Sequence, residues 1–367
     1  MKIECIKDKF SEAVGKVEKI AGRNPTLPVL SGIYFKASKK GLLIKSTNLD
    51  LGITLTLPVK VVEEGEVIVP AQVLHSFLSS LPPDKNITLS HNGNTLEVKT
   101  SFAKTTIKTL PLDEFPQIVE IPDDLVFTLP ARDLATGLKA VAYAASPGSM
   151  KPELGSILVS YNEGELVFAA TDSFRLGEKR LKIKKIPHFK QLLIPQKNAL
   201  EIIRLFDRES EEISLSVGEH QVAFRKEGFY LVSRIIEGTF PDYKQIIPKD
   251  FTGRAIILKE DLLSALKTNL VFADSFNQLT INLSPSKKIF EIDSKNTNVG
   301  ENISKVEAAL EGEDVSINVN HRYLTDCFQA ISADSISLSF NGPAKPIVVE
   351  GVGDKSFKYL VMPMNRS

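Results

Sequence analysis

The side chains most able to do chemistry are few in this chain and lie far apart in its sequence. The five histidines are scattered, and none is paired with another at metal-ligand spacing. The two cysteines, Cys5 and Cys327, form no CxxC or CxxH pattern, which disfavours a disulfide framework and a zinc site. The GxxxxGK(S/T), GxGxxG and GxSxG motifs are absent. We therefore expect no metal, no cofactor and no catalytic centre.

One stretch, residues 170–176 with the sequence Ala-Thr-Asp-Ser-Phe-Arg-Leu, does place ionic side chains close together. Asp172 and Arg175 have the types of a catalytic pair. Thr171 and Asp172 are also typical of a turn, in which their side chains cap backbone groups, as Thr47 and the residue after it would in an earlier copy. We favour the turn, and we interpret the Arg and the apolar residues around it as a docking site.

The elements that would position this stretch recur three times along the chain. Each copy contains a short strand, an amphipathic helix and then a hairpin. Two sets of anchors recur about 125 residues apart: the residue before the helix (Pro70, Pro195 and Asn320) and the hairpin glycine (Gly93, Gly218 and Gly342). The spacing predicts three similar domains, at residues 1–123, 124–250 and 251–367.

Each predicted domain also opens with a helix, expected near residues 8–22, 131–145 and 259–272, because apolar residues recur there at helical spacing. Alternating strands and turn residues follow each of these helices. A domain would then hold two helices on one face of an antiparallel sheet, which is an α+β architecture.

Composition places the chain among ordinary globular proteins, with 43% hydrophobic and 25% charged residues. No apolar run approaches the roughly 18 residues that span a bilayer, and the first residues do not resemble a signal peptide. We therefore expect a cytoplasmic protein with no membrane partner.

Lysine plus arginine equals aspartate plus glutamate, at 45 each, so global charge gives no support for a nucleic-acid partner. Basic residues do gather modestly on predicted helices. Two interpretations stay open, a solvated helix face and a surface that faces a polyanion. The residues concerned are Lys9, Lys16, Arg23, Lys197 and Arg204.

The last stretch of the sequence is apolar almost to its final residues, whereas chain ends are ordinarily polar. A terminal strand that completes its sheet would explain Tyr359 and Val361. It leaves Met362, Pro363 and Met364 unexplained, and two flexible thioethers suit an adaptable binding surface.

Several motifs in order, on this threefold background, resemble the bacterial DNA polymerase III beta subunit family of replication sliding clamps. They lie at residues 23–32, 170–176, 239–243, 319–324 and 359–364. The resemblance implies a non-enzymatic head-to-tail homodimer that closes into a ring of six domains. Helices would line a hole for double-stranded DNA, held without sequence specificity, so zero net charge is no objection. The basic residues named above would face the DNA.

The same resemblance implies a hydrophobic pocket between the second and third domains. It would bind short peptides of the replicative DNA polymerase subunit, the clamp loader and other proteins with a clamp-binding motif. By motif, its residues are Leu154, Thr171, Ser173, Phe174, Arg175, Leu176, Pro241, Gln245, Ile246, Asn320, Tyr323, Val361, Met362, Pro363 and Met364. The chain departs from the family at Ser173 and Phe174, where glycine followed by histidine or tyrosine is usual, and at Gln245, where some members have arginine.

The subunit contact would join an edge of the first domain to an edge of the third. The residues concerned are Lys104, Thr105, Thr106 and Ile107 on one side, and Phe272 and residues 296–302, including Glu301, on the other.

Two other classes of function remain. One is a scaffold repeat protein that binds peptides without DNA; the other, an enzyme acting on a polymer, is disfavoured by the missing catalytic motifs.

Overall fold

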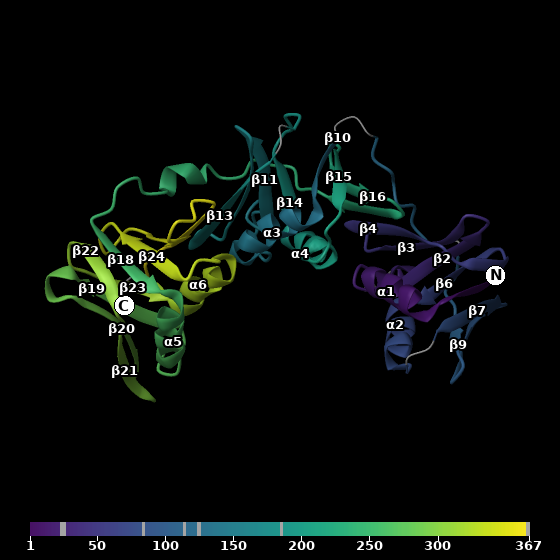
Figure 1. Cartoon of the computed structure of the whole chain (residues 1–367), viewed down its shortest axis with the longest axis horizontal. Coiled ribbons are helices and arrows are strands. Elements are labelled where there is room, and N and C mark those ends of the chain that lie inside the picture. Colours follow the sequence, from purple (N-terminus) through teal and green to yellow (C-terminus); the bar gives the residue numbers. More distant parts are fainter. Residues whose placement is uncertain (23–26, 83–84, 113–114, 123–125, 184–185, 365–367) are drawn as a thin grey trace. The chain divides into compact units, whose positions relative to one another are not determined.

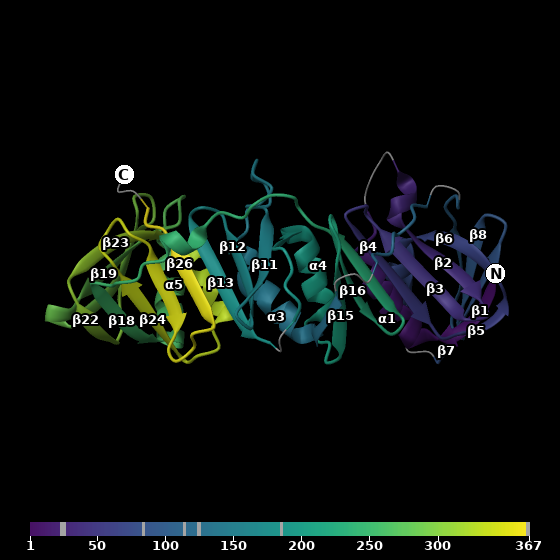
Figure 2. The ribbon, with the colours of Figure 1, turned by 90° about the horizontal axis from the view of Figure 1, so that it is seen from above.

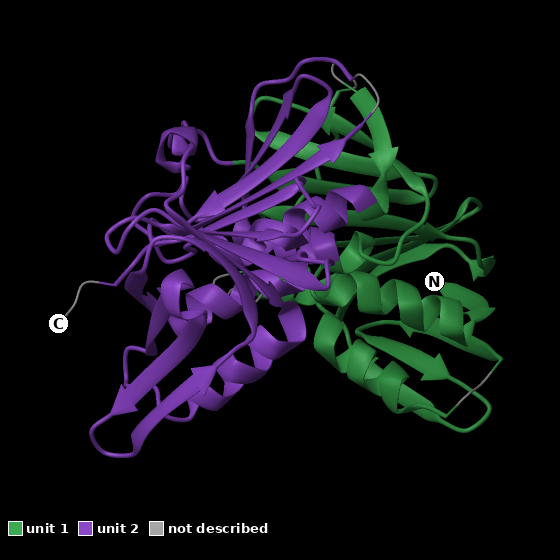
Figure 3. Cartoon of the chain, turned by 60° about the vertical axis from the view of Figure 1, so that its left-hand side comes forward, with its two compact units in different colours: residues 1–132, 204–235 green, residues 133–203, 236–367 purple. Residues whose placement is uncertain are grey.

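The computed structural model describes residues 1–22, 27–82, 85–112, 115–122, 126–183 and 186–364. These residues form two compact units, which Figure 3 draws in green and purple. Unit 1 comprises residues 1–132 and 204–235, and unit 2 comprises residues 133–203 and 236–367. Of the predicted domain boundaries, the one between residues 123 and 124 lies outside the described residues. The boundaries stay predictions.

Unit 1 contains a five-stranded antiparallel sheet from the first repeat, with β5 and β9 at its edges. Its strands, in spatial order, are β5 (Lys60–Glu63), β1 (Lys2–Ile6), β7 (Asn86–Asn92), β8 (Thr95–Lys99) and β9 (Lys104–Lys108). The predicted hairpin turn joins β7 to β8, where Gly93 has a φ of 59° that suits glycine.

A second sheet in unit 1 joins strands of the first and second repeats. Its order is β10 (Val126–Pro130), β15 (Glu212–Val217), β16 (Gln221–Lys226), β17 (Phe229–Arg234), β4 (Leu51–Leu57), β3 (Gly41–Thr47), β2 (Gly32–Ser38) and β6 (Gly65–Pro70). The repeats meet where β4 pairs with β17. A short helix, η1 (Pro28–Ser31), precedes β2. Helices α1 (Lys7–Glu18) and α2 (Ala71–Ser80) lie beside each other under these strands (Figure 1).

Unit 2 repeats this arrangement with strands of the second and third repeats. Its larger sheet has the order β14 (Leu192–Pro195), β11 (Ser156–Asn162), β12 (Glu165–Thr171), β13 (Arg175–Lys182), β26 (Phe357–Val361), β25 (Ile347–Gly351), β24 (Ser335–Phe340), β18 (Gly253–Leu258) and β22 (Ala308–Gly312). Figure 2 shows β12, β13 and β26 side by side. A four-stranded sheet has the order β21 (Gly300–Lys305), β20 (Ile289–Asn296), β19 (Gln278–Ser284) and β23 (Val315–Asn320).

The remaining helices belong to the second and third repeats. They are α3 (Ala131–Val141), η2 (Ala142–Ala144), α4 (Gln196–Phe206), η3 (Tyr243–Ile246), α5 (Lys259–Leu270), η4 (Pro285–Lys287), α6 (His321–Asp326) and η5 (Cys327–Ala330). The predicted opening helices are therefore confirmed, with ends shorter than expected. Gly137 lets α3 approach β12 closely, because a Cβ there would lie 2.2 Å from the ring of Phe168.

Each repeat supplies two α-helices that pack on antiparallel strands, so the predicted α+β architecture of three tandem domains is confirmed. The core is apolar, as in the buried Phe10, Val14 and Val17 of α1. Within the described residues, no helix has the length and hydrophobicity of a membrane span.

Candidate peptide-binding site

The second repeat and the end of the chain meet in one sheet, where β13 pairs with β26. Arg175 lies opposite Val361, and Leu176 lies opposite Leu360. Beyond the paired residues, the amide of Met362 donates to the carbonyl oxygen of Phe174 at 2.8 Å. Backbone pairing therefore places the turn at residues 171–175 next to the apolar residues that follow β26.

The turn before β13 is held by the side chains of Thr171 and Asp172. Thr171 Oγ1 donates to the carbonyl of Arg175 at 2.7 Å and accepts from the amide of Ser173 at 3.1 Å. Asp172 Oδ1 accepts from the amides of Phe174 and Arg175, both at 2.9 Å. The predicted capped turn is therefore confirmed, and Asp172 has a structural role.

The first repeat builds the same turn before β4. Thr47 Oγ1 donates to the carbonyl of Leu51 at 2.9 Å and accepts from the amide of Leu49 at 3.0 Å. The next side chain, Asn48, accepts from the amides of Asp50 and Leu51 at 3.0 and 2.8 Å. The equivalence inferred from sequence spacing thus extends to individual hydrogen bonds.

Ser173 has left-handed backbone geometry, with a φ of 76°. This conformation is costly for a residue with a Cβ and free for glycine. It explains physically why glycine suits this position, where the sequence departs from the usual family pattern. The four side-chain hydrogen bonds keep the turn intact despite the serine.

Arg175 joins the turn to α6. Its Nε donates to Asp172 Oδ2 at 2.9 Å, and its Nη1 donates to the carboxylate of Asp326. Its guanidinium carbon lies 4.6 Å from the centre of the Tyr323 ring, within cation–π range. Burial opposes its charge, but Tyr359, Asp326 and Asp172 together raise the pKa of Arg175, which stays protonated.

The floor of the site consists of buried residues, and its rim is exposed. Thr171, Leu176 and Val361 are buried, so they can shape the surface without presenting much area; the predicted Leu154 is also buried and lies just before β11. Phe174 is 60% exposed and stacks on the ring of Tyr323, with 6.3 Å between the ring centres. Partly exposed groups beside them are Arg175, Asn320, Tyr323, Met362, Pro363 and Met364.

A further wall comes from the segment between β17 and β18. Pro241, Gln245 and Ile246 are exposed on it, Ile246 by 51%. Its buried residues, Phe240 and Tyr243, pack in an apolar cluster that also contains Leu176 and Leu360. Gln245 Nε2 donates to Asp242 Oδ2 at 2.7 Å. The predicted pocket residues of the second repeat, the following segment and the chain end thus converge on one region of unit 2.

The side chain of Asn320, at this rim, is engaged in hydrogen bonds within the protein. Its Oδ1 caps α6 by accepting from the amides of Arg322 and Tyr323, at 2.9 and 3.3 Å. Its Nδ2 donates to the carbonyl of Phe276 at 2.9 Å. We conclude that Asn320 fixes the start of α6, and through it Tyr323.

Sequence inspection missed three residues that support the site: Asp326, Glu178 and Tyr143. Asp326 binds Arg175 from 151 residues away, and Glu178 accepts from the Tyr243 hydroxyl across 65 residues. The Tyr143 ring lies 5.8 Å from that of Tyr359 and 5.9 Å from the Arg175 guanidinium. None has a local motif, because only the folded chain brings these pairs together.

The described residues predicted to face DNA lie on or beside helices. Lys9 and Lys16 are on α1, where Lys16 forms an ion pair with Glu12 at 2.8 Å. Arg204 donates to the carbonyl of Lys16 at 2.8 Å, so unit 1 brings these two cations together. Lys197 is exposed on α4. Arg23 lies outside the described residues.

The predicted subunit contact falls on two strands at sheet edges. β9 contains Lys104, Thr105, Thr106 and Ile107; Ile107 points into its own core. β21, the edge of the four-stranded sheet, contains Glu301. Next to it, a Cβ on Gly300 would lie 3.6 Å from the ring of Phe272, so that ring covers the start of β21.

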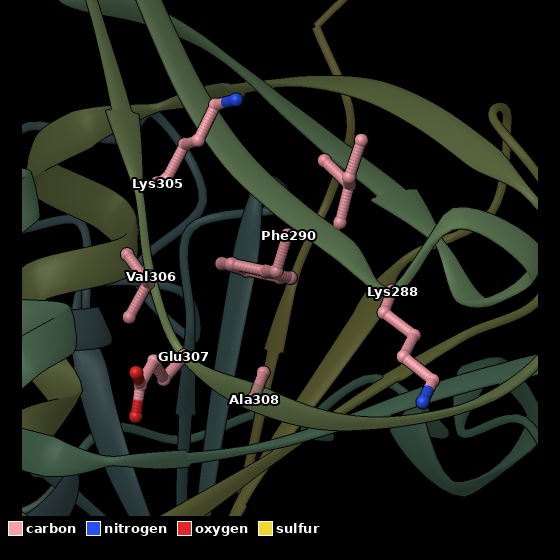
Figure 4. Close-up of a pocket in the computed structure, with 7 residues that line it drawn as sticks. Lys288, Phe290, Lys305, Val306, Glu307 and Ala308 are labelled. Carbon is pink, nitrogen blue, oxygen red and sulfur yellow. The ribbon is translucent and has the colours of Figure 1, made fainter.

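A pocket of about 440 Å³ lies on the third repeat, between the end of β21 and β20. Figure 4 shows Phe290 at its centre, with Lys288 and Lys305 on opposite sides pointing outward. Lys305 is paired with Glu291 at 3.5 Å. The rest of the lining consists of Glu307 and the apolar residues Ile289, Val306 and Ala308.

Both cysteines are free and buried. Burial raises the pKa of the Cys5 thiol to about 12 and also raises the pKa of Cys327. In the part of the chain that the structure describes, no group of three or more His, Cys, Asp or Glu residues could hold a metal ion.

Comparison with known proteins gives consistent matches along the chain. Family models match for the DNA polymerase III beta subunit: the N-terminal domain at residues 1–119, the central domain at 128–242 and the C-terminal domain at 244–365. A beta sliding clamp of Staphylococcus aureus is 25% identical over 374 residues, which cover 99% of both chains. One of Synechococcus elongatus is 27% identical over 371 residues, again 99% of both.

Solved structures share the fold over the full length. The DNA polymerase III beta subunit of Thermotoga maritima is 23% identical, with a TM-score of 0.94 and 100% of both chains covered. A sliding clamp of Pseudomonas aeruginosa bound to griselimycin is 24% identical, with a TM-score of 0.93 and the same coverage.

Proposed function

The chain belongs to the DNA polymerase III beta subunit family, and we propose that the surface around Arg175 is where it binds its partner proteins. The protein is a DNA sliding clamp, a ring-shaped homodimer that encircles duplex DNA and confers processivity without catalysing a reaction. The observation that carries the proposal is the pairing of β13 with β26, which puts the 171–175 turn beside Met362, Pro363 and Met364.

The proposed ligand is a short peptide with apolar side chains. Phe174, Ile246 and the two methionines offer apolar contact area, and each fully buried apolar side chain of a peptide would contribute about 1.5–3 kcal/mol. Ser173 and Gln245 lie among them as polar groups able to fix its direction. The buried floor keeps this surface in shape before a peptide arrives.

The proposed partners are the replicative polymerase subunit, the clamp loader and other proteins with a clamp-binding motif, in the cytoplasm. The test is binding of a fluorescein-labelled peptide carrying the clamp-binding motif of a replicative polymerase, measured by anisotropy. A Met362→Ala, Met364→Ala double variant should bind at least tenfold more weakly. Val352→Ala, which truncates a 42% exposed side chain elsewhere in unit 2, is the control. The proposal would be contradicted if the double variant kept its peptide affinity, or if it lost the dimer rather than peptide binding.

The proposed DNA-facing surface includes Lys9, Lys16, Lys197 and Arg204. Contacts of surface cations with phosphates contribute about 1 kcal/mol or less each, which suits a clamp that slides. After loading, the protein should stay on nicked circular plasmid and leave the same plasmid once it is linearised. Equal retention on both forms would favour a scaffold protein that does not enclose DNA.

The proposed subunit contact pairs β9 of one copy with β21 of another. Each strand has one unpaired edge in its own sheet, and Ile303 on β21 is 62% exposed. Ile303→Asp should shift the mass in solution from dimer to monomer. Val62→Asp is the matched control, because Val62 is also exposed on an edge strand, β5. A dimer that survives Ile303→Asp would place the contact elsewhere.

A further inference from the structure

We propose that Glu178 and Tyr243 are positioning residues for the peptide site, an inference that rests on the proposed function. Their hydrogen bond fastens the segment with Pro241, Gln245 and Ile246 to β13, the strand that begins at Arg175. Neither residue needs to touch the peptide. They set where one wall of the site lies.

Glu178 is a buried carboxylate with both oxygens engaged. It is 3% exposed, Oε2 accepts from the Tyr243 hydroxyl at 2.5 Å, and Oε1 accepts from Arg180 Nε at 2.8 Å. Arg180 also lies 3.6 Å from Glu165. A buried carboxylate is costly unless it is paired and hydrogen-bonded, so its two donors are held in fixed positions.

The Tyr243 ring is fixed from two other sides. It packs in the apolar cluster with Leu176 and Leu360, which are the paired residues of β13 and β26. It also meets the Phe240 ring edge-on, with 5.9 Å between centres. Burial and the nearby Glu178 raise the pKa of Tyr243, so its hydroxyl keeps the proton that it donates.

Tyr243 is the first residue of η3, and Gln245 and Ile246 follow it in that single turn. The residue that precedes this turn, Asp242, makes no side-chain capping hydrogen bond to it. A movement of Tyr243 therefore carries Ile246, the exposed apolar residue of the wall, with it. The hydrogen bond from the Tyr243 hydroxyl to Glu178 limits rotation and translation of this ring, which ring packing alone would allow.

The first repeat fastens its corresponding segment differently. Ile118 occupies the place of Tyr243, and Thr54 occupies the place of Glu178, at the offsets of the repeat. There the Tyr230 hydroxyl of β17 accepts from the amide of Ile121 and donates to the carbonyl of Val119, both at 3.1 Å. The fold can thus hold such a segment without a buried carboxylate, which ties the Glu178–Tyr243 pair to the segment that bears the site.

Tyr243→Phe tests the proposal, because it removes one hydroxyl and leaves the ring. We expect three- to tenfold weaker binding of the labelled peptide, mainly through faster dissociation, and faster hydrogen exchange confined to residues 240–247. Dimer mass should stay that of the unaltered protein, and the thermal midpoint should fall only slightly, because Glu178 loses one donor and keeps Arg180. Glu178→Gln should weaken binding in the same range. The double variant should bind the peptide no more weakly than the single variant with the lower affinity, because both changes act on the same hydrogen bond.

Tyr230→Phe is the matched control, since it removes the hydroxyl that fastens the first segment and should leave peptide affinity unchanged. Equal weakening by both Tyr→Phe variants would overturn the proposal in favour of a general stability effect. Unchanged exchange at residues 240–247 in Tyr243→Phe would overturn it directly. If the unaltered protein does not bind the peptide, the proposed function fails, while the exchange measurement still decides whether the hydroxyl positions the segment.

Discussion

The guanidinium carbon of Arg175 lies over the Tyr323 ring, 4.6 Å from the ring centre, while the same side chain binds the carboxylate of Asp326. One arginine of the second repeat therefore contacts two residues of α6 in the third. The arrangement suits a guanidinium, which can lie over an aromatic ring while several of its nitrogens donate hydrogen bonds to carboxylates.

Arg175→Lys should therefore be disruptive despite keeping the charge. A lysine cannot stack on Tyr323 and bind Asp172 and Asp326 together, so we expect a loss of about 1–3 kcal/mol in the free energy of unfolding. Peptide affinity should fall as the turn loosens. Chemical denaturation and peptide binding measure the two effects. Arg322→Lys, on the exposed side of the same helix, should change neither by more than about 0.5 kcal/mol.

Ser173→Gly should stabilise the turn relative to Ser173→Ala. Both variants remove the hydroxyl, but only alanine keeps a Cβ at a φ of 76°. We expect a difference of about 1 kcal/mol in the free energy of unfolding, with glycine the more stable. The same pair of changes at Ser286, on the short helix η4, should reverse the order, because glycine gains nothing there. Equal stability of the two Ser173 variants would mean that the backbone relaxes.

Asn269→Ala should weaken the edge that we assign to the subunit contact. Asn269 is fully buried on α5; it donates to the carbonyl of Ala265 and to Ser304 Oγ, both at 2.9 Å, and accepts from Ser294 Oγ at 2.9 Å. Removing the amide takes the acceptor from the Ser294 hydroxyl, while Ser304 Oγ keeps the bond from Asn302 Nδ2, and we expect a cost of about 1–3 kcal/mol in the free energy of unfolding. Because Ser304 is on β21, the dimer should also dissociate more readily.

Analytical ultracentrifugation of Asn269→Ala across a concentration series measures this dissociation. Asn162→Ala, on an exposed hairpin of the second repeat, is the control and should change nothing. If Asn269→Ala lowers the free energy of unfolding but leaves the dimer dissociation constant unchanged, the buried amide does not support the subunit contact.

His321 should make stability depend on pH in mildly acidic solution. Burial lowers the pKa of His321 below its ordinary 6.5, and its Nε2 lies 3.1 Å from the carbonyl oxygen of Leu266. Below pH 6.5 the imidazole is protonated in the unfolded chain but stays neutral in the folded chain, and this difference favours unfolding. The full contribution of His321 to the free energy of unfolding is therefore present only above pH 6.5. It is lost as the pH falls toward the folded pKa, at up to about 1.4 kcal/mol per pH unit.

Urea denaturation at pH 7.5 and 5.5 tests this, with His321→Gln expected to lose more stability at pH 7.5 but to show a smaller difference between the two conditions. His220→Gln is the control, because that side chain is 58% exposed. An identical pH difference in the unaltered protein and in His321→Gln would assign the effect to other groups.

Much of the fold could be predicted from the sequence because it depends on local patterns. Helical spacing located the opening helices, and the turn at Thr171 followed from short-range capping chemistry that Thr47 shares. The site was only partly predictable. Asp326 binds Arg175, 151 residues away, and Glu178 binds Tyr243, 65 residues away. No local sequence pattern predicts such pairs. The family resemblance supplied the pocket residues on the surface but not the buried bonds that hold them.

The two larger sheets carry a mechanical consequence. Each one runs from one repeat into the next, through β4–β17 in unit 1 and β13–β26 in unit 2, and the second repeat contributes strands to both. The joins between repeats are thus continuous hydrogen-bonded sheet, whereas the division between compact units falls inside the second repeat. Both halves of the peptide site therefore belong to one unit, where continuous backbone hydrogen bonds between β13 and β26 hold them in register.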